Sequence, residues 1–307
     1  MIKDIHGYGF DTIRIPVSWH NHVDGDLNIS AQWLDRVNEV VDWAIDDGMY
    51  VIINIHHDNH FEANGFYPDS EHLEQSKHYI ERIWTQLSEE FQDYDDKLIF
   101  ESMNEPRLVD TEYEWWIQNS AEECQDAVEC INVLNQTFVD TVRALGGKNA
   151  DRFLLIAGYG TNIDQTFDGR FQMPADSAEG KLMVSVHYYD PWSYCGASSA
   201  AGATPWGKQA DYETMYSQLS KMKKFTAAGY GVVIGEYGAL PGSDGEMKEN
   251  APAYHRAFLD CCDALDYTSC LWDTSGFYIR GEGKIIEEEM AALFIRRMEA
   301  VEAVATY

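Results

Sequence analysis

Seven short apolar runs, separated by longer amphipathic stretches, constrain the fold of this chain more than any other feature of its sequence. The runs are 12–17, 50–56, 98–103, 153–159, 182–189, 231–238 and 269–275. Most are continuously apolar, which is typical of parallel strands buried on both faces. The stretches between them have helical spacing, and we expect helices at 31–47, 71–92, 112–144, 211–228, 249–265 and 287–303. This alternation predicts an α/β fold, as a doubly wound sheet or a barrel.

Polar residues at the ends of the predicted strands separate these two folds. They are His56 and His57, Asn104 and Glu105, His187 and Tyr189, Glu236, and Trp272. Polar groups at the carboxyl ends of many strands are typical of a barrel active site, whereas a doubly wound sheet gathers them at one switch point. No glycine-rich phosphate-binding loop follows the first run. The sequence therefore predicts a (β/α)8 TIM barrel.

The number of runs is one short of the eight strands that such a barrel needs. The chain opens with a helix-like piece at 1–6, followed by Gly7-Tyr8-Gly9 and the first run. We therefore expect the first barrel strand to be missing from this sequence, and an eighth parallel strand formed by these residues would contradict that expectation. No linker or low-complexity tract interrupts the chain, so we expect one catalytic domain over residues 1–307.

The charge and the cysteines exclude several classes of protein. The 307 residues include 52 acidic and 22 basic ones, and the net charge of −30 argues against binding nucleic acid or an anionic membrane. No apolar run approaches the roughly 20 residues of a membrane span. Residues 1–7 lack the features of a signal peptide, so an export signal would have to lie upstream. Six cysteines are too few for a disulfide scaffold, and we expect Cys124 and Cys130 to be buried thiols.

Two carboxylates carry the chemical prediction. Glu105 lies in the motif NEP after one strand, and Glu236 lies in the motif GEYG at the end of another. Carboxylates from separate strands can face each other across a glycosidic bond, where one protonates the leaving oxygen and the other attacks the anomeric carbon or activates water. This pair favours a glycosidase, and the distance between the carboxyl groups would distinguish a retaining from an inverting mechanism.

Six motifs in order, RIPVSW, NIHHD, ESMNEP, VHYYDPW, GEYG and CLWD, resemble those of glycoside hydrolase family 5. They are most similar to its subfamily 4, the bacterial endo-β-1,4-glucanases and xyloglucanases, and the resemblance runs from Arg14 to the last strand. It implies a retaining endo-glycosidase that hydrolyses β-1,4-glucosidic bonds in cellulose or related β-glucans by double displacement. It implies neither a metal nor another cofactor. We expect such an enzyme to be secreted, because a polymeric glucan cannot enter a cell.

The resemblance also implies a role for individual residues. Glu105 would be the acid/base and Glu236 the nucleophile. Arg14 would lie beneath Glu236 and keep it ionised, and Tyr189 would hydrogen-bond it. Residues expected to contact the sugars are Asn104, His22, His56, His57, His187 and, as a stacking platform, Trp272.

Other interpretations remain open at this stage. The same family includes xyloglucanases, mixed-linkage glucanases, mannanases and xylanases, and a non-catalytic carbohydrate-binding barrel is a further alternative. The histidine-rich stretch 56–60 could bind a metal, although the glutamate motifs explain the chain better. Trp192, Tyr194 and Trp206 could be core residues or sugar platforms. We expect Trp115-Trp116 to begin a helix, with at least one of them in the core.

Overall fold

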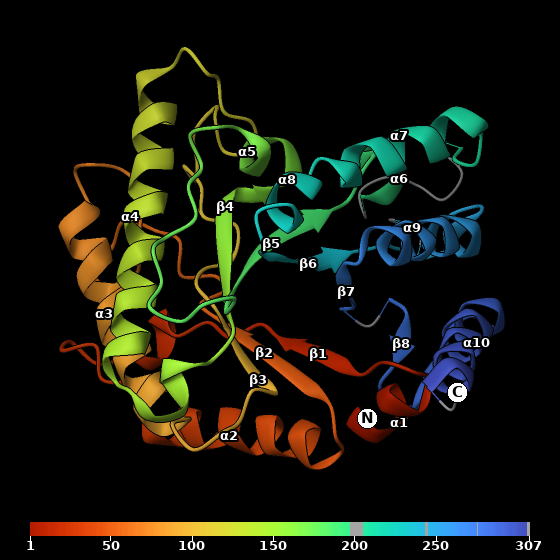
Figure 1. Cartoon of the computed structure of the whole chain (residues 1–307), viewed down its shortest axis with the longest axis horizontal. Coiled ribbons are helices and arrows are strands. Elements are labelled where there is room, and N and C mark those ends of the chain that lie inside the picture. Colours follow the sequence, from red (N-terminus) through yellow and green to blue (C-terminus); the bar gives the residue numbers. More distant parts are fainter. Residues whose placement is uncertain (197–204, 243–244, 275, 306–307) are drawn as a thin grey trace.

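A computed structural model describes residues 1–196, 205–242, 245–274 and 276–305 of the chain, and its centre is one parallel sheet. Seven strands follow one another in sequence order and curve into a nearly closed barrel (Figure 1). The strands are β1 (Thr12–Ile15), β2 (Tyr50–Asn54), β3 (Leu98–Glu101), β4 (Leu154–Asn162), β5 (Leu182–Tyr188), β6 (Gly231–Tyr237) and β7 (Thr268–Leu271). Each lies within or beside a predicted run, so the barrel prediction is confirmed. Residue 275, the end of the last predicted run, lies outside the described residues.

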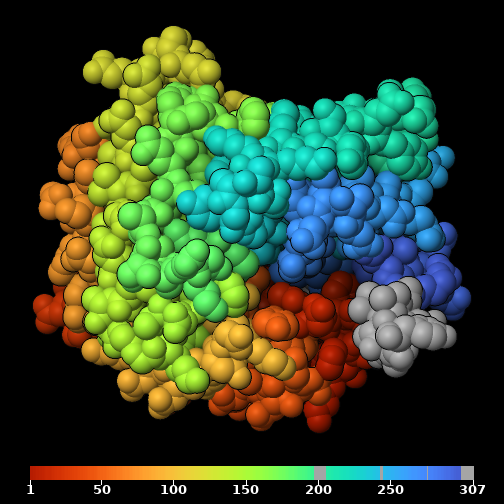
Figure 2. All heavy atoms as spheres, in the orientation of Figure 1, coloured from red at the N-terminus to blue at the C-terminus, as the bar shows by residue number. Residues whose placement is uncertain are grey.

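Helices cover the outside of the sheet. The long ones are α2 (Ala31–Asp46), α3 (Leu73–Glu90), α4 (Glu122–Ala144), α7 (Gln209–Ser220), α9 (Ala251–Leu265) and α10 (Glu288–Ala305). The short ones are α1 (Ile2–Gly7), α5 (Ile163–Phe167), α6 (Trp192–Cys195) and α8 (Lys223–Thr226), with 3-10 turns at His20–His22 and Gly147–Ala150. In the space-filling view, the teal and blue atoms of α7 and α9 adjoin on one side, and the orange and yellow-green atoms of α3 and α4 adjoin on the other (Figure 2).

Two predicted helices differ from the observed ones. The helix predicted over 112–144 begins only at Glu122, because side chains of β4 and α5 bind the backbone of the preceding loop. Gln165 accepts a hydrogen bond from the Ile117 amide and donates one to the Trp115 carbonyl. The expectation that Trp115-Trp116 begins a helix and contributes to the core is therefore wrong, since both side chains are more than half exposed. The helix predicted over 211–228 is divided into α7 and α8.

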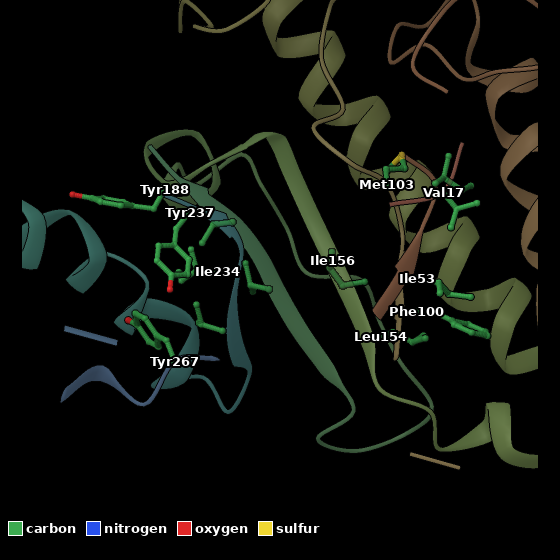
Figure 3. Packing of buried hydrophobic residues seen from close by; sticks show 14 of the residues in the cluster. Val17, Ile53, Phe100, Met103, Leu154, Ile156, Tyr188, Ile234, Tyr237 and Tyr267 are labelled. Atoms are coloured by element: carbon green, nitrogen blue, oxygen red, sulfur yellow. The ribbon is translucent and has the colours of Figure 1, made fainter. Parts of the chain in front are cut away.

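Alternate residues of each strand point to opposite faces of the sheet, and this places the core in two parts. Outward residues such as Ile53, Phe100, Leu154, Ile156 and Ile234 pack beneath the helices (Figure 3). Inward residues form a smaller cluster inside the barrel, which we call the inner apolar layer. It consists of Ile52, Ile99, Leu155, Val233 and Cys270.

Polar side chains occupy the barrel interior next to this layer, and they position the candidate site. Asn54, Glu101 and Ser185 each stand two residues beyond an inward-facing apolar residue of their strand, and all three are buried. Together with the Arg14 side chain, which is 3% exposed, they form what we call the inner polar layer. Because the strands are parallel, this layer lies toward their carboxyl ends.

The sheet ends at β1 and β7, and no eighth parallel strand occurs in the described part of the chain. A cavity of about 380 Å³ lies between these two strands, lined in part by Ile13, Arg14, Leu271 and Trp272. Around it, Phe10 contacts Phe294 of α10 with ring centroids 4.6 Å apart, and a hairpin of β8 (Tyr278–Ile279) and β9 (Lys284–Ile285) packs nearby. No helix within the described ranges has the length and apolar character to cross a membrane.

Candidate active site

The two predicted carboxylates lie together at the carboxyl end of the barrel. Glu236 is part of β6, and Glu105 follows β3 in the loop that leads to α4. One carboxylate oxygen of each and one ring nitrogen of His187 all lie within 4.8 Å of one another. Oxygen atoms this close fit carboxyl groups held roughly 5–5.5 Å apart, as in retaining glycosidases, better than the about 6.5–9.5 Å of inverting ones.

The Arg14 guanidinium donates hydrogen bonds to two carboxylates and one side-chain amide at the inner end of the site. Its Nε donates to Glu101 at 2.7 Å, its Nη1 to Glu236 at 2.9 Å and its Nη2 to Asn104 at 2.7 Å. Burial opposes the charge on Arg14, but Glu101 and Glu236 outweigh it and raise the guanidinium pKa. Because Arg14 occupies the Asn104 oxygen, the amide group of Asn104 is oriented with its NH2 as the free donor.

His187 lies between the two carboxylates. Its Nδ1 is 2.8 Å from Glu105 Oε1 and 3.6 Å from Glu236 Oε2. Burial disfavours the imidazolium, but Glu236 and Glu105 outweigh it and raise the His187 pKa. Burial alone would also raise the pKa of Glu105, but the hydrogen bond from His187 and the charges of His187, Arg107 and Arg14 lower it. These two shifts favour a His187 imidazolium that donates through Nδ1 to the Glu105 carboxylate.

Tyr189 holds the other oxygen of Glu236. Its hydroxyl donates to Glu236 Oε2 at 3.0 Å, so each oxygen of this carboxylate accepts a hydrogen bond from a fixed donor. Burial and the adjacent Glu236 charge raise the pKa of Tyr189, which keeps its proton on the phenol. The carboxylate of Glu236 is thus fixed in orientation before any substrate enters.

His56 and Trp272 form a second wall of the site. Their rings stack at 5.7 Å with an interplanar angle of 12°. Burial, followed by the charge of Arg14, lowers the pKa of His56 to about 2, so the ring is neutral. Asn54 donates to its Nδ1 at 3.1 Å, because the Asn54 oxygen already accepts from the Val17 amide. The proton of His56 is therefore on Nε2, which can donate to a ligand.

Two of the histidines predicted to contact sugars make no described hydrogen bond through their rings to the other predicted site residues. His57 is exposed and its ring lies 4.4 Å from that of His56. His22 stacks on Trp33 of α2 at 3.9 Å, and the described contacts connect it to none of the other predicted site residues.

The aromatic residues left open by the sequence fall into two groups. Tyr194 and Trp206 are buried and belong to the core. Trp192 is 57% exposed, and its ring meets that of Tyr189 edge-on at 6.1 Å. Trp192 is therefore available as an aromatic surface beside the Glu236 side of the site.

Several residues of the site were not predicted from the sequence. Glu101 accepts hydrogen bonds from Arg14, Asn54 and Ser185, the last at 2.6 Å. The only sequence signal for it is an acidic residue inside the apolar run LIFESM. Asp58 accepts bonds from the backbone amides of Trp19 and His20 and from the Tyr79 hydroxyl.

The metal interpretation of residues 56–60 has no support in this geometry. Within the described residues, the group that brings three potential metal-binding side chains together is Glu105, His187 and Glu236. In the histidine-rich stretch, Asp58 binds backbone and Tyr79, and His56 binds Asn54.

Comparison with known proteins identifies the family. Residues 1–277 match the model of the cellulase family, glycosyl hydrolase family 5. Endoglucanase A of Ruminococcus albus is 34% identical over 284 residues, which are 92% of this chain and 74% of that protein. Across four curated endoglucanases that it matches, the chain spans 47% to 74% of their length.

Solved structures agree with this assignment. A family 5 lichenase from Caldicellulosiruptor sp. F32 superposes with a TM-score of 0.90 at 37% identity, covering 97% of this chain and 83% of that one. A subfamily 4 broad-specificity endoglucanase from Ruminococcus champanellensis with bound cellotriose superposes with a TM-score of 0.83 at 33% identity, covering 96% and 84%. The chain therefore belongs to glycoside hydrolase family 5, the cellulase family, as its strand-end motifs predict.

Proposed function

We propose that this chain is a retaining endo-β-1,4-glucanase acting on cellulose or a related β-glucan, with Glu236 as nucleophile and Glu105 as acid/base. The observation that carries the mechanism is the grouping of both carboxylates and His187 within 4.8 Å. Carboxyl groups this close favour a retaining mechanism, because inverting enzymes hold them about 6.5–9.5 Å apart to admit the attacking water. The endoglucanase relatives support the choice of substrate class.

In the first step, an oxygen of Glu236 attacks the anomeric carbon while Glu105 protonates the departing glycosidic oxygen. The C–O bond to the leaving sugar breaks, and an ester bond to Glu236 forms. Arg14 and Tyr189 hold the attacking carboxylate in place through one hydrogen bond to each of its oxygens. The proton of His187 Nδ1 can pass to Glu105 along their 2.8 Å hydrogen bond without any side-chain movement.

In the second step, Glu105 takes a proton from water, and the resulting hydroxide equivalent attacks the anomeric carbon. The ester bond to Glu236 breaks, and the sugar is released with its original configuration. Every atom and proton is accounted for by two carboxylates and water, so this mechanism needs no metal or other cofactor.

The remaining predicted residues fit sugar binding. The free NH2 of Asn104 can donate to the sugar 2-hydroxyl, a bond that strengthens in the transition state. Neutral His56 can donate through Nε2, and His22 and His57 are proposed as further contacts. Trp272 offers its ring face to the apolar C–H face of a pyranose. We also propose that residues 1–307 act as a single catalytic domain outside the cell, because a glucan polymer does not enter cells.

A polysaccharide panel with product sizing tests this function. Cellulose, mixed-linkage glucan, xyloglucan, mannan and xylan are each incubated with the wild type, with Glu105→Ala and with Glu112→Ala. Glu112 is an exposed glutamate of the same loop and serves as the matched control. We expect the wild type and the control to release mid-sized oligosaccharides from a β-glucan, and Glu105→Ala to release almost none.

Other outcomes would overturn part or all of the proposal. Faster cleavage of xyloglucan, mannan or xylan than of any unbranched β-glucan would reassign the substrate within the family. Binding of glucan without release of reducing ends from any polymer would favour the non-catalytic carbohydrate-binding barrel. If proton NMR showed that the anomeric centre is inverted in the first product, the roles given to Glu105 and Glu236 would be contradicted.

A further inference from the structure

Arg107, two residues after Glu105, was not singled out by the sequence, yet its guanidinium contacts an acid, an aromatic ring and the Glu105 backbone. Its Nε lies 3.2 Å from Glu114 Oε1, and its guanidinium carbon lies 4.2 Å from the centroid of the Trp115 ring. Its Nη1 donates to the backbone carbonyl of Glu105 at 3.0 Å. Arg107 is thus clamped between an acid and an aromatic face and directed at the residue proposed to be the acid/base.

The contact between Arg107 and the Glu105 carbonyl stabilises an unusual backbone conformation at Glu105. Glu105 has φ of +44°, in the left-handed region that a residue with a side chain adopts only when its surroundings impose it. The adjoining groups are all held: the Gly160 amide donates to the Pro106 carbonyl, and Asn59 exchanges two hydrogen bonds with the Arg107 backbone. The Arg107 side chain closes the turn by binding the carbonyl of Glu105 itself.

The charge of Arg107 reaches the Glu105 carboxyl without a hydrogen bond. Nη1 lies 3.8 Å from Glu105 Oε2, beyond hydrogen-bond distance, so Oε2 remains open toward a ligand. The other groups that act on this carboxyl come from three strands: Arg14 on β1, His187 on β5 and Glu236 on β6. Glu114 partly neutralises Arg107 from the far side.

We propose that Arg107 is a positioning residue for Glu105: it holds the left-handed turn that directs the carboxyl at the scissile bond and keeps a positive charge beside it. This inference rests on the proposed function. It goes beyond that function because it assigns the geometry and acidity of the acid/base to a clamp formed by Arg107, Glu114 and Trp115.

Two aryl glycosides separate positioning from simple structural support. 2,4-Dinitrophenyl β-cellotrioside has a leaving group that departs without a proton, whereas phenyl β-cellotrioside needs the acid. For Arg107→Met we expect kcat/KM on the phenyl substrate to fall by about 30-fold, which is part of the roughly 10²–10⁴ that general acid catalysis supplies in full. On the dinitrophenyl substrate the fall should stay below about threefold, because protonation contributes little there.

The pH profiles of three variants separate the charge from the contacts. Arg107→Met removes a positive charge and so raises the pKa of Glu105, which moves the alkaline limb of kcat/KM to higher pH. Glu114→Gln leaves Arg107 uncompensated and moves the limb to lower pH. Arg107→Lys keeps the charge and leaves the limb in place, while losing part of the rate because an ammonium cannot reproduce the guanidinium contacts.

Arg36→Met is the matched control. Arg36 also stacks on a tryptophan, Trp43 at 4.9 Å, and also pairs with a glutamate, Glu39, but it lies on α2 away from the site. We expect it to leave both rates and the limb unchanged. Equal losses on both substrates by Arg107→Met and Arg107→Lys, with unmoved limbs, would overturn the inference and leave Arg107 a structural residue. A wild type inactive on both glycosides and on every polysaccharide would instead contradict the proposed function.

Discussion

The barrel interior contains two regions built on the same strands with opposite chemistry. The inner apolar layer of Ile52, Ile99, Leu155, Val233 and Cys270 fills the barrel. Two residues further along β2, β3 and β5, the same inward face carries Asn54, Glu101 and Ser185, which with Arg14 form the inner polar layer. Both layers are almost completely shielded from solvent, and only the second bonds to the candidate carboxylates.

The difference between the layers shows how a closed sheet separates stability from chemistry. A strand places every second residue on the inside, so a step of two residues moves along the barrel axis without changing face. The apolar layer gains stability from packing, whereas every polar group of the second layer is satisfied by a partner within the barrel. Changes in the two layers should therefore have separable effects on folding and on catalysis.

The largest effect on activity is expected from Glu236→Ala, which removes a carboxylate that binds Arg14 of the inner polar layer. Loss of the proposed nucleophile should lower kcat on a soluble β-glucan by about 10⁴-fold or more. Arg14 retains Glu101, so the fold should persist. Reducing-end release and circular dichroism measure the two properties. A variant that retains more than a few per cent of wild-type kcat would remove Glu236 from the mechanism.

Glu101→Gln tests whether the polar layer is one unit. This change takes a charge from the buried pair with Arg14, and we expect it to lower the free energy of unfolding by about 3 kcal/mol. It should also lower kcat more than it changes KM, because Arg14 positions Glu236 and Asn104. Glu39→Gln breaks an exposed ion pair with Arg36 and should cost less than about 1 kcal/mol. Equal effects of the two changes, by urea unfolding, would mean that the layer is not energetically coupled.

Leu155→Ala probes the apolar layer alone. Leu155 is completely buried in that layer, and its truncation should cost about 3 kcal/mol with kcat nearly unchanged at a temperature where the variant is folded. Leu154→Ala, which removes a buried leucine from the outward face of the same strand, is the matched control and should behave alike. A large loss of kcat in Leu155→Ala without a loss of stability would contradict the separation of the layers.

The smallest expected effect concerns how the free energy of unfolding depends on pH. We expect this dependence to arise from Glu105 and His187 and not from the inner apolar layer. The raised pKa of His187 means that its contribution is present below its unfolded value of about 6.5 and is lost as pH rises through the folded value. The lowered pKa of Glu105 means that its contribution is present above about 4.3 and is lost as pH falls. The difference in unfolding free energy between the wild type and Glu105→Gln should thus be greatest between these values, at about 1 kcal/mol.

The cost of Leu155→Ala provides the comparison for this titration. Cys270 is the ionisable member of the inner apolar layer, and burial raises the pKa of its thiol to about 12. The cost of Leu155→Ala should therefore stay constant from pH 4 to pH 8. A cost that follows the same curve as Glu105→Gln in chemical unfolding would show that the layers titrate together.

The strands and the ends of the strands were predictable because buried parallel strands leave continuous apolar runs. Glu105, Glu236, His187 and Tyr189 stand directly at or after such runs, and the structure brings them together with Arg14. The family motifs allowed these residues to be assigned roles in advance. The barrel prediction succeeded for the same reason, since polar residues followed several runs rather than one.

The sequence does not show which residues of a run point inward, because both faces of the sheet are apolar. Glu101 therefore went unassigned, although it is the residue on which Arg14, Asn54 and Ser185 converge. The start of α4 was wrong by ten residues because the loop 112–121 is held by side chains distant in sequence, above all Gln165. Arg107 was missed because its clamp depends on the path of that loop.

The left-handed backbone at Glu105 means that selection for thermal stability and selection for catalytic activity favour different residues at this position. A non-glycine residue in this conformation costs on the order of 1–3 kcal/mol, and glycine or asparagine would relieve much of it. A library screened only for survival at high temperature should therefore enrich Glu105→Gly or Glu105→Asn, yielding hardier proteins that no longer cut glucan. Directed evolution of this barrel therefore needs a test of activity at every round, because one route to higher thermal tolerance passes through the proposed acid/base.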